Sequence, residues 1–215
     1  MREYLKDFKH LIWDFNGTLL DDAHLCVKAV NELLKGQNLP VIDVAKYQQV
    51  FDFPVSDYYI KLGFDYGMET FESLSERFHD IYHACLDEVL VFEETIEVIK
   101  NLSQTSHKTN YILSAAQQND LVSMVDRFAL KPYFKAIYGL EDRLARSKVE
   151  RGLDLIHSEG INPADCLMIG DTTHDLEVGK AMGVEVLLVT GGHHHEDRLT
   201  REHHRIHRRG APLTF

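Results

Sequence analysis

Five polar side chains lie beside apolar segments of this sequence, where they could act together on one substrate. Asp14 and Ser114 each follow an apolar run, and Asp171 follows a third. Asp175 comes one helical turn after Asp171, and Lys148 begins a segment of helical periodicity. Converging carboxylates repel one another unless a cation holds them, and oxygen ligands favour a hard ion such as Mg²⁺. A phosphate group bound there would need the ion, the ammonium and the hydroxyl to offset its charge. These residue types therefore predict a site for Mg²⁺ and phosphate.

Short strands of a parallel sheet are the elements that could bring these residues together. Besides the run before Asp14, four stretches are continuously apolar, which is typical of strands that are covered on both faces. They are 109–113, 136–138, 165–169 and 185–189. Helical periodicity in 121–128, 149–156 and 173–182 separates them. Alternating strands and helices predict a doubly wound α/β fold, in which ligands bind at the carboxyl ends of the strands.

The segment 20–89 interrupts this alternation. It contains helical patterns and no convincing strand, with one helix starting after Asp21 or Asp22 and a longer one covering about 71–85. We therefore expect an α/β core domain made of 1–19 plus 90–215 and a helical cap domain, 20–89, inserted after the first strand. Aromatic residues around Phe53, Pro54 and Tyr58 are expected either to face the site or to pack inside the cap.

Composition narrows the class of protein. The 215 residues have a formal charge of −11, which argues against nucleic acid or an anionic membrane as the main partner. The three cysteines, Cys26, Cys85 and Cys166, are far apart, as expected of reduced thiols. No apolar run approaches the roughly 18 residues needed to span a bilayer. The chain is thus predicted to be cytoplasmic, and its oligomeric state is left open.

The stretch from His193 to His207 holds six histidines and several arginines. His203 and His207 would share one face of a helix at this spacing, so a metal site is conceivable. Nothing nearby would complete the ligand shell, so a solvated polar helix is the preferred interpretation.

Taken in order, the polar residues resemble the four motifs of the haloacid dehalogenase-like hydrolase superfamily. The first is Asp14-Phe15-Asn16-Gly17-Thr18, followed by Ser114, Lys148 and the stretch Gly170-Asp171-Thr172-Thr173-His174-Asp175. The predicted helical insert is similar to the small cap that this superfamily carries at the same place. The match covers nearly the whole chain and is closest to the phosphoglycolate phosphatase-like group.

The resemblance implies a role for each residue. Asp14 would be the nucleophile and would form an aspartyl-phosphate. Mg²⁺ would be held by Asp14, the main-chain carbonyl of Asn16, and Asp171, with support from Asp175. The resemblance assigns the following residues to phosphate and substrate binding: Asn16, Gly17, Thr18, Ser114, Ala115 and Lys148. Of these, Thr18 would also support the loop, and Ser114 and Lys148 would assist catalysis.

Asn16 departs from the family pattern. In the family's phosphatases the residue here is a second aspartate, which protonates the leaving alcohol and then activates water. An amide can do neither, and such acid–base help is typically worth ~10²–10⁴-fold in rate. His24 or Asp22 could substitute as the acid, although the spacing does not support either. A large gain in rate for Asn16→Asp would show that the amide limits hydrolysis.

We therefore expect a Mg²⁺-dependent hydrolase of small phosphorylated metabolites, attenuated by Asn16. An alternative is a catalytically weak phosphometabolite-binding or regulatory protein on the same fold. A dehalogenase is less favoured, because it would not need the metal-binding pair Asp171 and Asp175. A phosphonatase is also less favoured, because it would need a cap lysine that forms a Schiff base, and nothing singles out Lys46 or Lys61.

Overall fold

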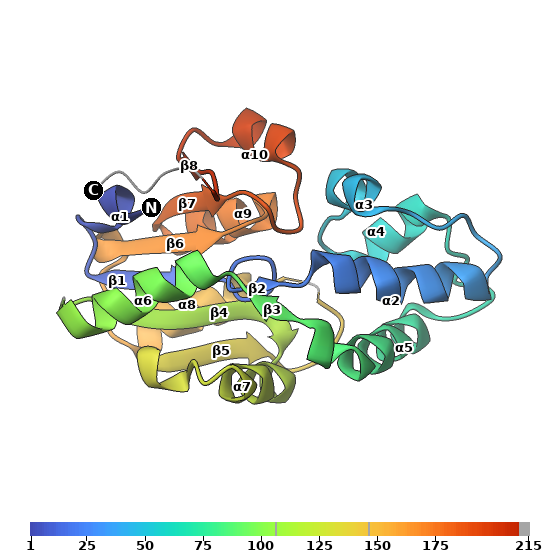
Figure 1. Cartoon of the computed structure of the whole chain (residues 1–215), viewed down its shortest axis with the longest axis horizontal. Helices are drawn as coiled ribbons and strands as arrows, with labels where there is room; N and C mark the ends of the chain where they lie inside the picture. Colours follow the sequence, from blue (N-terminus) through green and yellow to red (C-terminus); the bar gives the residue numbers. More distant parts are fainter. Residues whose placement is uncertain (106, 146, 211–215) are drawn as a thin grey trace.

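A computed structural model describes residues 1–105, 107–145 and 147–210. Its centre is a six-stranded sheet in the order β5-β4-β1-β6-β7-β8, and every neighbouring pair is parallel (Figure 1). The strands are β1 (His10–Trp13), β4 (Thr109–Gln117), β5 (Ala136–Leu140), β6 (Cys166–Gly170), β7 (Glu185–Val189) and β8 (Ile206–His207). The predicted α/β fold with a doubly wound parallel sheet is confirmed.

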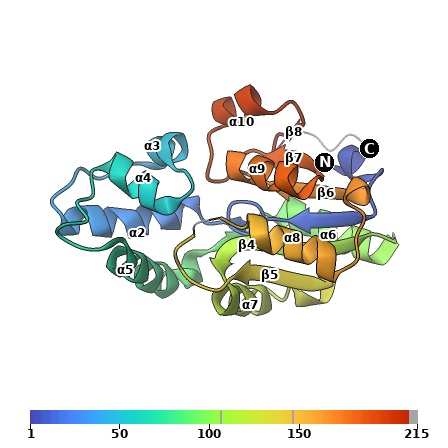
Figure 2. The same ribbon diagram turned by 180° about the vertical axis from the view of Figure 1, so that it is seen from behind.

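Each face of the sheet has its own apolar core. In β1, Leu11 and Trp13 belong to one buried cluster and Ile12 to the other, because successive side chains of a strand point to opposite faces. Helices α6 (Glu93–Thr105) and α7 (Gln118–Arg127) cover the face seen in Figure 1. Helices α8 (Val149–Ser158) and α9 (Thr173–Met182) cover the face seen in Figure 2. This two-sided burial explains the continuous apolar runs.

Four helices lie beyond the carboxyl ends of the strands and make a separate lobe (Figure 1). They are α2 (Ala23–Gly36), α3 (Val44–Val50), α4 (Val55–Leu62) and α5 (Phe71–Ala84). The chain enters the lobe through β2 (Leu20–Asp21) and leaves it near β3 (Leu90–Val91), and these two short strands pair antiparallel. These two strands mark where the chain passes between the sheet and the helical lobe. The division into 1–19 plus 90–215 and 20–89 stays a prediction.

Short elements complete the described chain. They are α1 (Arg2–Leu5), α10 (Glu196–Glu202) and the 3₁₀ turns η1 (Leu86–Glu88), η2 (Lys131–Tyr133) and η3 (Pro163–Asp165). Cys26, Cys85 and Cys166 are free thiols, as predicted. Within the described residues, the helices are all too short or too polar to cross a bilayer.

The histidine-rich segment differs from the prediction. Only 196–202 are helical, and the chain then returns to the sheet as β8. His193, His194 and His207 are buried, and the N-terminal ammonium lies 3.2 Å from His207 Nδ1. The expectation of a solvated polar helix is wrong here, because tertiary contacts take up histidines that local composition assigns to solvent.

Candidate active site

Asp14 stands at the carboxyl end of β1, with β4 on one side and β6 on the other. Its amide donates to the carbonyl of Ile169 in β6 (2.8 Å), which ties the end of β1 to β6. The chain then turns at Gly17, whose φ of +71° favours glycine. A Cβ at Gly17 would also collide with the Asp171 carboxylate and the His193 ring. Glycine at this position therefore permits both the turn and the close approach of Asp171.

Three buried carboxylates meet at this edge of the sheet. One oxygen each of Asp14, Asp171 and Asp175 lies within 4.8 Å of the others. The Thr18 hydroxyl lies 3.1 Å from Asp14 Oδ2 and 2.8 Å from Asp171 Oδ1. Asp175 Oδ2 accepts from the amide and hydroxyl of Thr172, which forms a capping box at the start of α9. The structure thus brings the predicted acids together and orients them through neighbouring hydroxyls.

Lys148 supplies a positive charge to this cluster. Its Nζ donates to Asp14 Oδ1 and to the Leu113 carbonyl (3.1 Å), and lies 2.7 Å from Asp175 Oδ1. Lys148 occupies the N-cap of α8 and makes no side-chain cap, so its ammonium is free to turn into the site. Although burial by itself would lower the pKa of Lys148, Asp14 and Asp175 raise it. Lys148 is therefore charged in this site.

One ammonium does not offset three buried carboxylates. Burial raises the pKa of Asp14 to about 8, even with Lys148 beside it. Burial also raises the pKa of Asp171. A dication held between the carboxylates would favour their ionised forms, and all three offer oxygen, the donor that Mg²⁺ prefers. The donor set therefore fits Mg²⁺.

Ser114 also belongs to this part of the structure. It lies within β4 and not after it, because β4 extends to Gln117 and is longer than the predicted strand 109–113. The side chain is buried, and its Oγ accepts from the amide of Ala116 (3.1 Å). Its hydroxyl proton remains available to donate. Ser114 and Ala115, which the sequence predicts to bind phosphate, line the same pocket as Asp14 and Lys148.

Two residues of the predicted phosphate-binding set have other partners. The amide of Gly17 donates to Asp22 Oδ1 (2.9 Å), and the Thr18 hydroxyl is taken up by Asp14 and Asp171. Neither group is free to bind phosphate in this structure, since each already meets a buried carboxylate. The predicted role of Thr18 in supporting the loop stays a prediction.

Asn16 belongs to a buried polar network on the other side of the loop. Its Nδ2 donates to Asp22 Oδ2 (2.7 Å) and to the Tyr82 hydroxyl (3.1 Å). His193 places its Nε2 3.4 Å from Asp22 Oδ1, and its Nδ1 lies 2.9 Å from the Tyr47 hydroxyl. Burial alone would lower the pKa of His193, but nearby carboxylates, led by Asp22, raise it to about 9. The network thus contains an Asp22–His193 ion pair.

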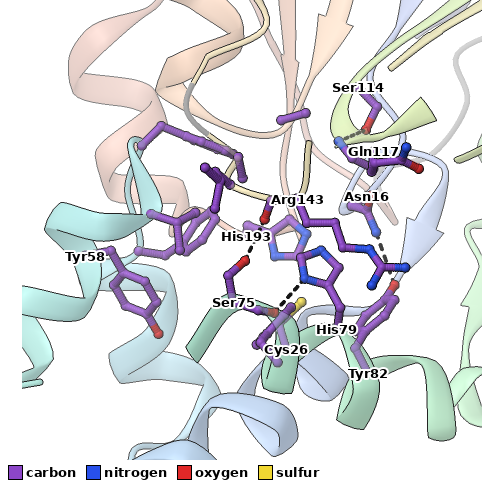
Figure 3. A pocket seen from close by; sticks show the side chains of 18 of the residues that line it. Asn16, Cys26, Tyr58, Ser75, His79, Tyr82, Ser114, Gln117, Arg143 and His193 are labelled. Atoms are coloured by element: carbon purple, nitrogen blue, oxygen red, sulfur yellow. Dashed lines mark hydrogen bonds between the residues drawn. The ribbon is translucent and has the colours of Figure 1, made fainter. Parts of the chain in front are cut away.

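The pocket that Asp14 lines lies between the sheet edge and the helical lobe. Figure 3 shows Ser114, Asn16 and Gln117 on one side and residues of α5, including His79 and Tyr82, facing them. Much of the remaining lining is aromatic or aliphatic. These residues include Val30, Phe51, Phe53, Val55, Tyr58, Tyr59, Phe71, Phe78, Met124 and Leu144. The leaving group of a substrate would therefore meet a mainly apolar surface.

Of the residues in the helical lobe that the sequence singled out as candidates for the site, some line the pocket and others do not. Phe53 and Tyr58 line the pocket, and the Phe53 ring stacks on His174 with centroids 4.6 Å apart. Pro54, predicted beside them, is exposed. The proposed substitute acid His24 is also exposed on α2. The other proposed substitute, Asp22, is fully buried and bound to Asn16.

Neither lysine considered for a Schiff base belongs to the pocket lining. Lys46 is exposed, and Lys61 pairs with Asp52 at 3.2 Å. The phosphonatase alternative gains no support from these positions.

Several residues of the C-terminal segment reach the site without having been predicted there. The His193 amide donates to Asp171 Oδ2 (2.6 Å), and a Cβ at Gly192 would collide with the same carboxylate. Arg209 donates from Nη1 to the Gly17 carbonyl (2.9 Å) and from Nη2 to the Thr18 carbonyl (2.6 Å). In the sequence, only the high histidine content of 193–207 marked this segment as unusual. Composition alone did not indicate that the segment lies beside Asp14 and Asp171.

Residues 11–189 match the family model described as haloacid dehalogenase-like hydrolase. A 5'-nucleotidase of Pseudomonas aeruginosa is 30% identical over 96% of this chain and 93% of its own length. A phosphoglycolate phosphatase of Caulobacter vibrioides is 26% identical over 86% of this chain and 81% of its own length. Among solved structures, a predicted phosphatase of Clostridium acetobutylicum superposes with a TM-score of 0.80 at 20% identity, covering 94% of this chain and 93% of that one.

Proposed function

Because the chain belongs to the haloacid dehalogenase-like hydrolase family, we propose that it hydrolyses small phosphomonoesters with Mg²⁺ through an aspartyl-phosphate on Asp14. One observation carries this proposal. The buried carboxylates of Asp14, Asp171 and Asp175 form a cluster, and Lys148 pairs with two of them at the pocket. The names of the relatives, 5'-nucleotidase and phosphoglycolate phosphatase, support the same reaction class. The helical lobe, 20–89, would act as the cap over this pocket.

Mg²⁺ would be held by Asp14, Asp171 and the carbonyl of Asn16, with Asp175 behind them. Bound there, it would neutralise charge on the nucleophile and on the transferring phosphoryl group. Asp175 is a supporting residue in this scheme, because Thr172 and Lys148 already occupy its oxygens.

The chain's own residues would carry out two displacements. An Asp14 oxygen forms a bond to phosphorus while the bond from phosphorus to the ester oxygen breaks. The ester oxygen departs as an alkoxide, which takes a proton from solvent water. The Ser114 hydroxyl binds a phosphoryl oxygen during this transfer, and the Lys148 ammonium, held between Asp14 and Asp175, offsets the negative charge of the nucleophile and of the phosphate. Water then attacks the same phosphorus, which releases phosphate and restores the Asp14 carboxylate.

Asn16 would attenuate the reaction. The amide neither protonates the departing alkoxide nor takes a proton from the attacking water. Alkyl phosphates, whose leaving groups need protonation most, should therefore be hydrolysed slowly. Aryl or acyl phosphates should lose less in the first step.

A p-nitrophenyl phosphate assay with and without Mg²⁺ tests this proposal, with Asp14→Asn as the matched control. We expect Mg²⁺-dependent turnover that the substitution reduces to background. If wild type and variant are equally inactive while both bind inorganic phosphate, the chain is instead a phosphometabolite-binding or regulatory protein. If wild type is active, a panel of phosphorylated metabolites assayed in the same way would rank its substrates.

A further inference from the structure

The orientation of the Asn16 amide is dictated by one neighbour. Asp22 Oδ2 accepts from Asn16 Nδ2 at 2.7 Å, and a carboxylate can only accept hydrogen bonds. The amide nitrogen must therefore face Asp22, and the amide oxygen must face away from it. An ionised carboxylate at position 16 would have no proton to donate to Asp22.

Asp22 binds several parts of the site at once. Besides Asn16, it accepts from the Gly17 amide (2.9 Å) and the Tyr82 hydroxyl (2.8 Å), and it pairs with His193. These partners come from the loop after β1, from α5 and from the segment after β7. One buried carboxylate thus joins the nucleophile's loop to the helical lobe and to the C-terminal segment.

A simple structural role at the start of α2 does not account for this side chain. Asp22 occupies the N-cap of that helix, where an aspartate commonly accepts from the first turn. Here its carboxylate makes no cap hydrogen bond and turns toward the loop after β1. The residue is fully buried, so solvent does not explain its conformation either.

We propose that Asp22 is a positioning residue for the nucleophile's loop, and that its carboxylate is what requires an amide at position 16. The inference rests on the proposed function, since it explains how this chain can tolerate Asn16 in place of an acid. It changes the expectation for Asn16→Asp. That single substitution places two carboxylates in contact inside a buried site, where they would share one proton. The shared proton would lie between positions 16 and 22 and would not face the leaving group, so the substitution should not restore the missing acid.

The double variant Asn16→Asp/Asp22→Asn reverses the donors and acceptors between positions 16 and 22 and keeps one carboxylate in the network, while His193 then faces an amide at position 22. The new amide at position 22 has two N–H groups, one for the new carboxylate and one for the Tyr82 oxygen. Its carbonyl oxygen can still accept from the Gly17 amide. The Tyr82 hydroxyl can then donate to position 16. An acid is thereby placed beside the nucleophile without a facing carboxylate.

The test measures kcat and KM for 2-hydroxyethyl phosphate and p-nitrophenyl phosphate in four proteins. They are wild type, Asn16→Asp, Asn16→Asp/Asp22→Asn and the control Asn16→Asp/Asp21→Asn. Asp21 is the adjacent acid on β2 and lies only partly buried. We expect Asn16→Asp and the control to have a kcat no higher than wild type. The Asp22 double variant should exceed Asn16→Asp by at least ~10-fold in kcat on the alkyl ester, with KM little changed.

Thermal unfolding without Mg²⁺ gives a second measurement that does not depend on turnover. Asn16→Asp should lower the midpoint by more than about 4 °C, and the Asp22 double variant should recover most of that loss. Equal activity and equal midpoints for Asn16→Asp and the double variant would overturn the proposal. If Asp14→Asn matches wild type in the assay above, the proposed function fails. In that case the thermal unfolding midpoints alone test whether Asp22 constrains position 16. A midpoint of the Asp22 double variant well above that of Asn16→Asp supports the inference, and equal midpoints overturn it.

Discussion

At the scale of single residues, the balance between Lys148 and three acids governs this site. Lys148 is the one lysine in the described lining of the pocket, and it is buried against Asp14 and Asp175. A buried ammonium is stabilising only while its partners stay charged. The same carboxylates are the groups that would hold Mg²⁺. The ammonium and the dication therefore offset the same excess of negative charge.

Replacing Lys148 tests this balance. In the presence of EDTA, Lys148→Met should lower the free energy of unfolding by about 3–5 kcal/mol, because it leaves buried carboxylates without their partner. Saturating Mg²⁺ should stabilise the variant more than it stabilises wild type, since the ion then acts on uncompensated charge. Urea denaturation with and without Mg²⁺ measures both effects. Lys131→Met is the control, because that lysine is exposed and distant from the site in the fold. An equal response to Mg²⁺ in all three proteins would contradict the prediction.

At the scale of elements, the segment after β7 belongs to the candidate site as well as to the sheet. His193 binds Asp171 through its amide, and Arg209 binds the carbonyls of Gly17 and Thr18 in the loop that follows Asp14. The Arg209 guanidinium also covers the Phe92 ring, 3.4 Å from its centroid. Because the contacts of Arg209 with Gly17 and Thr18 link residues nearly 200 positions apart, they shape the loop only in the folded chain.

Arg209 offers a direct test of that role. Arg209→Met keeps an aliphatic side chain over Phe92 but removes the donors to Gly17 and Thr18. We expect a loss of about 2–3 kcal/mol in the free energy of unfolding, since hydrogen bonds to a charged donor are involved. The kcat for p-nitrophenyl phosphate should fall more than KM rises. The neighbouring Arg208 makes an exposed ion pair with Glu196, so Arg208→Met should cost less than about 1 kcal/mol. Similar losses for the two variants would show that Arg209 has no special role.

The elements differ in how far sequence could predict them. The strand ends that carry Asp14 and Asp171 were predictable, because apolar runs and the following acids are local signals. Asp22 looked like a helix cap, and only the fold shows that its carboxylate turns to Asn16. His193 and Arg209 were missed for the same reason: their partners lie far away in the sequence. Local sequence signals thus predicted the acids that cluster at the strand ends, and tertiary contacts added the groups that orient them.

The pocket between α5 and the loop after β5 leads to a prediction about substrates. Its one arginine in the described lining, Arg143, is bound by Asp120 through Nε and Nη2 (2.8 and 3.1 Å) and by Glu76 (3.0 Å). Lys148 is likewise paired. A leaving group with its own carboxylate would find neither cation free, and the rest of the lining is mainly apolar.

We therefore expect 2-hydroxyethyl phosphate to be hydrolysed with a higher kcat/KM than phosphoglycolate, which has a similar size but carries a carboxylate. Asp120→Asn should narrow this difference, because it weakens the hold on Arg143. Steady-state rates for the two substrates in wild type and variant provide the measurement. A preference of wild type for phosphoglycolate would show that the pocket rearranges to supply a cation.

At the scale of the whole molecule, hydrogen bonds and an ion pair connect the helical lobe to the sheet-containing core on two sides of the pocket. On one side, Ser75 of α5 donates to the Arg143 carbonyl (2.6 Å). On the other, Gln48 of α3 donates to the Gly192 carbonyl (2.7 Å), and Arg198 pairs with Asp52 (2.9 Å). The helical insert and the parallel sheet could be predicted from periodicity. The polar contacts between the lobe and the core could not be predicted, because the local sequence around a polar surface residue does not indicate which distant residue it will contact.

Burial of His194 in the same region makes the stability of the whole chain depend on pH. Its Nδ1 accepts from the Thr173 amide (3.0 Å), and the side chain is 1% exposed. Burial, assisted by the charge of Arg198, lowers the pKa of His194 to about 3. The unfolded chain takes up this proton near the ordinary histidine pKa of about 6.5, whereas the folded chain does not. Stability from this group is therefore present above pH 6.5 and is lost as pH falls toward 3.

His194→Asn removes the titration and keeps an acceptor for the Thr173 amide. Between pH 7 and pH 5, wild type should lose on the order of 2 kcal/mol more of its free energy of unfolding than this variant does. Urea denaturation at the two pH values, in EDTA, gives the comparison. His204→Asn is the matched control, because His204 is exposed in the same segment and its replacement should leave the wild-type slope unchanged. If His194→Asn follows the wild-type slope as well, His194 is protonated in the folded chain and its burial does not set the acid limit of stability.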